Sequence, residues 1–137
     1  MSNQAAIAQA WRHLHLEALD LPAPDGDSEI EIRFEEIEAR IHALLDGVGA
    51  PARYLRDLTP TIAAIRREFP GWGWSACQRD TPRGKMTGEG YIHNNRPFEK
   101  GCGRVHFDHF AMTPEIGLCA ALCAAQAWRL DPMEDVL

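Results

Sequence analysis

The chain has 137 residues, of which 45% are hydrophobic and 25% are charged, a composition typical of one globular domain and not of a disordered chain. Its net charge of -6 disfavours a generic nucleic-acid-binding protein, since such proteins are usually basic, but does not exclude one. No apolar run reaches the roughly 18–20 residues of a membrane span, and the first residues lack the pattern of a secretory signal. We therefore expect a cytoplasmic protein whose four cysteines are reduced thiols.

Two amphipathic helices are predicted in the first third of the chain. The first covers residues 1–21, because apolar residues recur there at spacings of three and four: Ile7, Trp11, Leu14, Ala18 and Leu21. The segment 28–46 begins with a strand-like alternation, but a longer helical pattern runs through it and favours a helix. Ser28 and Glu31 have the spacing of a capping box, and Gly47 is the expected C-terminal stop.

A third helix is predicted to open at Thr59-Pro60 and to end at Pro70-Gly71, since threonine caps helices and proline suits their first position. Three strands should follow, over residues 72–78, 91–94 and 103–110.

Thr113-Pro114 repeats the helix-opening pattern and starts a last helix that runs to about Leu130. This helix is apolar almost all round, so we expect Leu118, Cys119 and Leu122 to be buried between the sheet and another helix. Its small residues would let it lie close to the sheet.

Helices, then strands, then a helix predict an α+β fold. We expect about three antiparallel strands layered with helices, in the manner of an α-β-α sandwich, behind an N-terminal helical extension. Residues 1–137 should form a single domain, with the extension at 1–21, the core at 28–130 and an acidic tail at 131–137.

The segment 54–128 contains Tyr54-Leu55-Arg56-Asp57 before a helix, a tryptophan-bearing strand at 72–74 and a closing helix that begins at Thr113-Pro114. In these features it resembles the phage ABA-sandwich domain family. The resemblance implies a sheet layered with helices, a phage or prophage origin and a location in the cytoplasm of a bacterial host. It implies no activity and no functional residues, and the N-terminal helix and the excursion at 79–104 depart from the family pattern.

Charge is unevenly distributed, and each cluster is either a solvated surface or a binding surface. The acidic cluster could mimic nucleic-acid phosphates toward a partner, and its candidate residues are Asp25, Asp27, Glu29, Glu31, Glu35, Glu36 and Glu38. The basic cluster could bind phosphates or an acidic protein, with Tyr91 available for stacking on bases. Its candidates are Arg79, Arg83, Lys85, Arg96, Lys100 and Arg104.

A metal site is conceivable from Cys102, His106 and His109, because zinc takes cysteine and histidine ligands. An extended strand would place His106 and His109 on opposite faces, however, so we expect no metal and no cofactor. Cys119 and Cys123 are expected to fill the core as small apolar residues.

The function expected from these features is that of a non-enzymatic phage or prophage protein that binds a host or phage protein. One concrete form is an inhibitor of a bacterial defence system such as CRISPR-Cas. One alternative is a nucleic-acid-binding module that uses the basic 79–104 excursion, and another is a small zinc-binding protein. Self-association into a homo-oligomer stays open.

Overall fold

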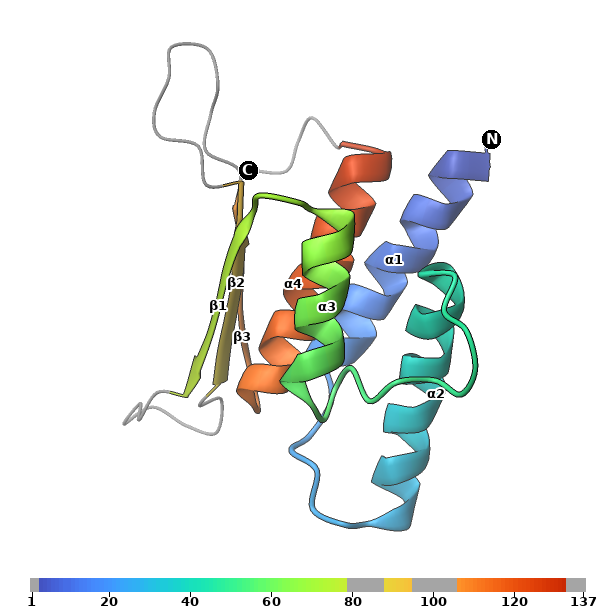
Figure 1. Cartoon of the computed structure of the whole chain (residues 1–137). Coiled ribbons are helices and arrows are strands. Elements are labelled where there is room, and N and C mark those ends of the chain that lie inside the picture. The colour runs from blue at the N-terminus through green and yellow to red at the C-terminus, as the bar shows by residue number, and fades with distance from the viewer. Residues whose placement is uncertain (1–2, 79–87, 95–105, 133–137) are drawn as a thin grey trace.

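The computed structural model describes residues 3–78, 88–94 and 106–132, with four helices and three strands (Figure 1). The elements are α1 (Asn3–Leu19), α2 (Ser28–Leu44), α3 (Leu58–Glu68), β1 (Gly73–Gln78), β2 (Gly88–His93), β3 (His106–Ala111) and α4 (Pro114–Leu130). The strands form one antiparallel sheet in the order β1-β2-β3. The predicted α+β class and the predicted antiparallel sheet are thus confirmed.

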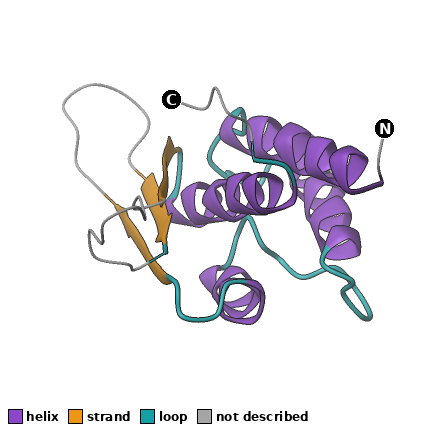
Figure 2. Cartoon of the chain, turned by 90° about the horizontal axis from the view of Figure 1, so that it is seen from above, coloured by secondary structure: helices purple, strands orange, loops and turns teal. Residues whose placement is uncertain are grey.

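The described helices lie on one side of the sheet. Helix α4 packs directly on the three strands, and α1 packs mainly on α4 and also contacts β3 (Figure 1; Figure 2). The opposite face of the sheet carries no helix from the described part of the chain. We call the face against α4 the inner face and the other the outer face.

Glycines in β2 bring the backbone of α4 into contact with the sheet. A Cβ atom on Gly90 would lie 2.0 Å from the backbone nitrogen of Leu118, and one on Gly88 would lie 2.0 Å from the carbonyl carbon of Thr113. On the helix side, a Cβ on Gly117 would lie 2.7 Å from the nitrogen of Gly90. No side chain fits between the two elements at these points, which is why this helix sits so close to its sheet.

The hydrophobic core extends from the sheet to α1 without interruption. Leu118, Cys119 and Leu122 of α4 have no exposed surface, which confirms the predicted burial of this helix. Trp11 and Leu14 of α1 are buried in the same cluster. The predicted N-terminal extension is therefore part of the core, because its apolar stripe covers the far side of α4.

Two predicted helix caps were wrong by one or two residues. Asp27, and not Ser28, caps α2, and Asp57, and not Thr59, caps α3 through a hydrogen bond of 3.1 Å from the backbone of Thr59. Both aspartates have extended backbone and accept from the first free amides of the helix, as N-caps do. Thr113 caps α4 as predicted.

The end of α2 also differs in detail from the prediction. Asp46, with a φ of 55°, adopts the left-handed conformation that was expected at Gly47. The backbone N–H of Gly47 donates to the carbonyl of His42 at 2.8 Å, and that of Asp46 donates to the carbonyl of Ala43 at 3.1 Å. These two bonds form a Schellman motif, in which aspartate is tolerated because its short polar side chain permits this conformation.

Candidate functional site

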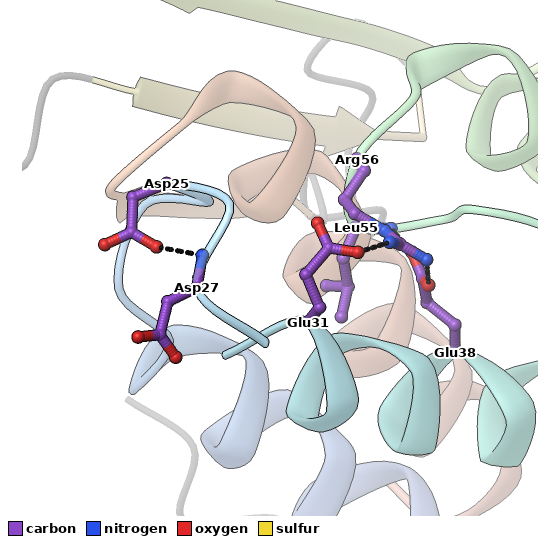
Figure 3. A network of polar contacts seen from close by, with 6 residues as sticks. All are labelled: Asp25, Asp27, Glu31, Glu38, Leu55 and Arg56. Atoms are coloured by element: carbon purple, nitrogen blue, oxygen red, sulfur yellow. Dashed lines mark hydrogen bonds and ion pairs between the residues drawn. The ribbon is translucent and has the colours of Figure 1, made fainter. Parts of the chain in front are cut away.

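The acidic residues predicted as a binding surface fall into two groups, and the first supports the fold. Asp27 accepts hydrogen bonds from the backbone of Glu29 and Ile30 at 2.9 and 3.2 Å. Asp25 accepts from the backbone N–H of Asp27 at 2.9 Å (Figure 3). Both aspartates are exposed, but their hydrogen bonds hold the turn that starts α2.

Glu38 is not a surface residue, which corrects its predicted place in the acidic binding surface. It is 2% exposed and accepts hydrogen bonds from the backbone N–H of Leu55 at 3.0 Å and from the Nε of Arg56 at 3.3 Å (Figure 3). Arg56 also pairs with the half-buried Glu31 at 3.2 Å. The hydrogen bond to Glu38 raises the pKa of Arg56, although burial opposes this. The network fastens α2 to the segment before α3.

The second group of acidic residues is exposed. Glu29, Glu35 and Glu36 are exposed on α2, with Ile32 among them at 54% exposure. Their spacings of three and four residues place them on one face of the helix. We call these four residues the α2 patch.

The outer face of the sheet gathers polar and aromatic side chains from all three strands. Because side chains alternate along a strand, every second residue faces outward, and the register places these residues in rows. Ile92 and Ala111, on the inner face, are fully buried. The outer rows are Gly73–His93–His106, Ser75–Tyr91–Asp108 and Cys77–Glu89–Phe110.

Three rings are in contact on this outer face and form what we call the aromatic cluster. The ring centroid of Tyr91 lies 5.0 Å from that of His93 and 5.7 Å from that of His106. The ring of His93 lies over Gly73, where a Cβ would be 2.3 Å from its Nε2. His106 is exposed, and Phe110 on the same face is 50% exposed. Such a cluster offers ring faces and edges to a ligand.

The predicted basic binding residues lie outside the described residues, so their positions are not part of the site geometry. They are Arg79, Arg83, Lys85, Arg96, Lys100 and Arg104. Their place in the connectivity is defined, however. Gln78 pairs with Gly88 at one end of the sheet, and His93 pairs with His106 at the other. The basic residues therefore belong to the connection from β1 to β2 at one end of the sheet and to the connection from β2 to β3 at the other end, where His93 and His106 lie.

The candidate metal ligands do not converge. His106 is exposed on the outer face, whereas His109 faces inward against His15 of α1, with ring centroids 4.4 Å apart. The predicted placement of His106 and His109 on opposite faces is thus confirmed, and Cys102 lies outside the described residues. Within the described ranges, no group of three or more His, Cys, Asp or Glu is placed to hold a metal ion.

The cysteines of α4 belong to the core. Cys119 and Cys123 have no exposed surface, and the hydrogen bond with Cys123, together with burial, raises the pKa of Cys119. A thiol in this state is not a nucleophile at neutral pH. On the outer face, the Sγ of Cys77 donates to Glu89 at 3.5 Å.

Two histidines with defined roles escaped prediction from the sequence. His42 Nδ1 lies 2.7 Å from the hydroxyl of the buried Tyr54, whose pKa is raised by its burial. His15 follows Trp11 by four residues, so helical spacing alone would have placed it near the buried face of α1. The partner of His15, His109, lies too far along the chain for that spacing to find it.

Comparison with known proteins gives no relative. No protein-family model matches the chain, and neither a curated protein nor a solved structure matches it. The resemblance to the phage ABA-sandwich domain family therefore stays a prediction. None of the helices in the described ranges has the length and apolar character needed to cross a membrane.

Proposed function

We propose that this protein binds single-stranded nucleic acid, without catalysis, through the outer face of its sheet. The observation that carries the proposal is the aromatic cluster, in which Tyr91 contacts both His93 and His106 on a face that no described helix covers. Bases stack on aromatic side chains of open sheets in several classes of nucleic-acid-binding protein.

The charges of this part of the chain support the same ligand. Residues 73–111 contain six Lys or Arg against four Asp or Glu, whereas the whole chain has a net charge of -6. Asp108 and Glu89 lie on the outer face itself and disfavour phosphate over its centre. Bases are thus expected on the aromatic cluster and phosphates near the connections between the strands.

Fluorescence anisotropy with labelled oligothymidylate and oligouridylate tests this function. Tyr91→Ala should weaken binding roughly 5- to 150-fold, the equivalent of about 1–3 kcal/mol for one lost stacking interaction. Tyr91→Phe keeps the ring and should bind nearly as the wild type, and His106→Ala should weaken binding like Tyr91→Ala. His13→Ala is the matched control, because His13 is exposed on α1.

The salt dependence of the same binding separates phosphate contacts from other contacts. The affinity should fall with a log–log slope of about -0.7 for each phosphate contact with a single strand. An absence of binding at low salt, or equal affinities for the wild type and Tyr91→Ala, would reject the proposal.

A second candidate function is the binding of a host or phage protein through the α2 patch. The observation in its favour is Ile32, a large apolar side chain at 54% exposure among three carboxylates. An inhibitor of a CRISPR-Cas or other defence system would use such a surface against a basic groove.

To test this second candidate, the amount of partner recovered from bacterial lysate is compared between the wild type and the double variant Glu35→Lys/Glu36→Lys. Asp46→Asn, which removes a charge at the far end of α2, is the control. Glu38 is unsuitable for charge reversal, because it is buried against Arg56. Unchanged recovery by the double variant would exclude the α2 patch as the contact surface.

A further inference from the structure

A cavity of about 240 Å³ lies on the inner side of the sheet, between α1, β3 and α4. Its walls are mainly apolar, and they are formed by Phe107, Ala124, Ala127 and Trp128. The rings of Phe107 and Trp128 lie 6.0 Å apart. Three nitrogen-bearing side chains complete the lining: Arg12, His15 and His109. The cavity is separate from the aromatic cluster, which occupies the other face of the sheet.

Two ring nitrogens at this cavity have no partner. The Nε2 atoms of His15 and His109 are buried, and they are the buried side-chain nitrogen or oxygen atoms without a hydrogen bond in the described part of the chain. The two imidazoles are in contact, with centroids 4.4 Å apart and planes tilted by 51°. Buried polar atoms are nearly always hydrogen-bonded, so this pair points to a ligand or water that enters when the two rings move apart.

The charge state of the lining limits the ligand to uncharged molecules. Burial lowers the pKa of His15, and burial together with His15 lowers the pKa of His109 to about 4. Both imidazoles are therefore neutral at neutral pH. The guanidinium of Arg12 is occupied by Asp131, whose carbonyl oxygen lies at 2.6 Å and whose carboxylate lies at 3.4 Å. Among the described lining residues, no unpaired charge is left to hold an ion.

We propose that this cavity binds a small uncharged aromatic molecule with one hydroxyl group, of the phenol class. On binding, the two rings move apart and the hydroxyl enters between them, donating to the Nε2 of one and accepting from the Nε2–H of the other, since a neutral imidazole offers either role according to its tautomer. The ring of the ligand packs on Phe107 and Trp128. A cavity of about 150 Å³ already holds benzene, so 240 Å³ accommodates one ring with its substituent.

Phenol itself is the probe, titrated into the full chain at submillimolar concentration while the ring nitrogens of His15 and His109 are observed by NMR. Phenol should shift both Nε2 signals, quench the fluorescence of Trp128 and raise the melting temperature. Benzene fills the same space without a hydroxyl and should bind at least about tenfold more weakly, which corresponds to about 1.4 kcal/mol.

Three variants separate filling of the cavity from polar recognition. Ala124→Leu fills the cavity and should abolish phenol binding, and the melting temperature without ligand shows that the variant folds. His15→Phe keeps a ring but removes one Nε2, so it should bind phenol and benzene about equally. His13→Gln, at an exposed position of the same helix, should bind phenol as the wild type does.

Several results would overturn the proposal. Equal affinity of the wild type for phenol and benzene would leave the histidines without a role in recognition. A lack of phenol binding, with a slowly exchanging water detected between the imidazoles, would assign the nitrogens to water. Stoichiometric binding of added Zn²⁺ by His15 and His109 that phenol does not displace would make the pair a metal site instead.

Discussion

Glu38 and Arg56 form the most buried ion pair among the described residues, with side chains 2% and 10% exposed. The guanidinium reaches both carboxylate oxygens, at 2.5 and 3.3 Å, while the same carboxylate accepts from the backbone of Leu55. Both oxygens of the carboxylate thus accept hydrogen bonds. A buried ion pair needs such two-point contact to compensate for the hydration that its charges lose on folding. The pair thus fixes how α2 meets the segment that leads into α3.

Arg56→Ala should therefore lower the free energy of unfolding by about 3–5 kcal/mol, because it leaves the carboxylate of Glu38 buried and uncompensated. Urea denaturation measures the change. Arg53→Ala is the control at an exposed position three residues earlier, where about 0.5 kcal/mol or less is expected. Similar losses in the two variants would show that Glu38 does not depend on Arg56.

The cap of α2 gives a second prediction, at two adjacent residues. Asp27→Ala removes the acceptor of two backbone amides and should destabilise the protein by about 0.5–2 kcal/mol. Ser28→Ala should have almost no effect, since Ser28 lies inside the helix. Chemical denaturation of both variants decides the matter, and the reverse order would restore Ser28 as the cap.

Local patterns predicted the last helix but not the first residues of the central strand. Thr113, proline and an apolar surface identify α4 from the sequence alone, and the bounds agree at about Leu130. The predicted strand began at residue 91, yet Gly88 and Gly90 both belong to β2. These glycines allow α4 to approach the sheet closely. Because the contacting segments are nearly thirty residues apart, no pattern among neighbouring residues predicts this contact.

In the acidic cluster, too, the sequence pattern indicates which residue is buried but not which residue pairs with it. Helical spacing places Glu38 between the buried Ile37 and Ile41, so its burial could have been predicted from the pattern. Its partner Arg56 could not, because it comes from another segment of the chain. The aromatic cluster likewise depends on strand register, which pairs His93 with His106 and could not be derived from composition.

Gly90→Ala should disrupt the contact between β2 and α4. The added Cβ would lie 2.0 Å from the backbone nitrogen of Leu118, and a backbone atom cannot rotate away as a side chain can. We expect a loss at or above the upper end of the roughly 1–3 kcal/mol that overpacking costs. Thermal denaturation against Ser75→Ala, an exposed change on the adjacent strand, measures it. A neutral Gly90→Ala would mean that α4 lies farther from the sheet.

Leu122→Ala addresses the same helix by removing volume. Leu122 has no exposed surface, so the truncation leaves a cavity and should cost about 2–5 kcal/mol. That is a large part of the roughly 5–15 kcal/mol typical of a whole domain. Urea denaturation gives the value, and a loss below about 1 kcal/mol would indicate that the neighbouring side chains close the space.

The stability of the protein should fall as the pH decreases from about 6.5 to about 4, through His109. Its pKa is about 4 in the folded chain, because of burial and then of His15, against about 6.5 when unfolded. Between these values the unfolded chain binds more protons, so acid favours unfolding, and above about 6.5 the residue has no effect. His15, whose pKa is lowered by burial, acts in the same direction.

The pH effect is measured as the difference in free energy of unfolding between the wild type and His109→Leu. The remaining charged groups beside the cavity, Arg12 and its partner Asp131, are the same in the wild type and in the variant. Relative to the wild type, the variant should gain stability as the pH falls from about 7 to about 5. His13→Gln should show no such gain. A difference that is the same at both pH values would mean that the imidazole of His109 takes up its proton in the folded chain, which requires water in the cavity beside it.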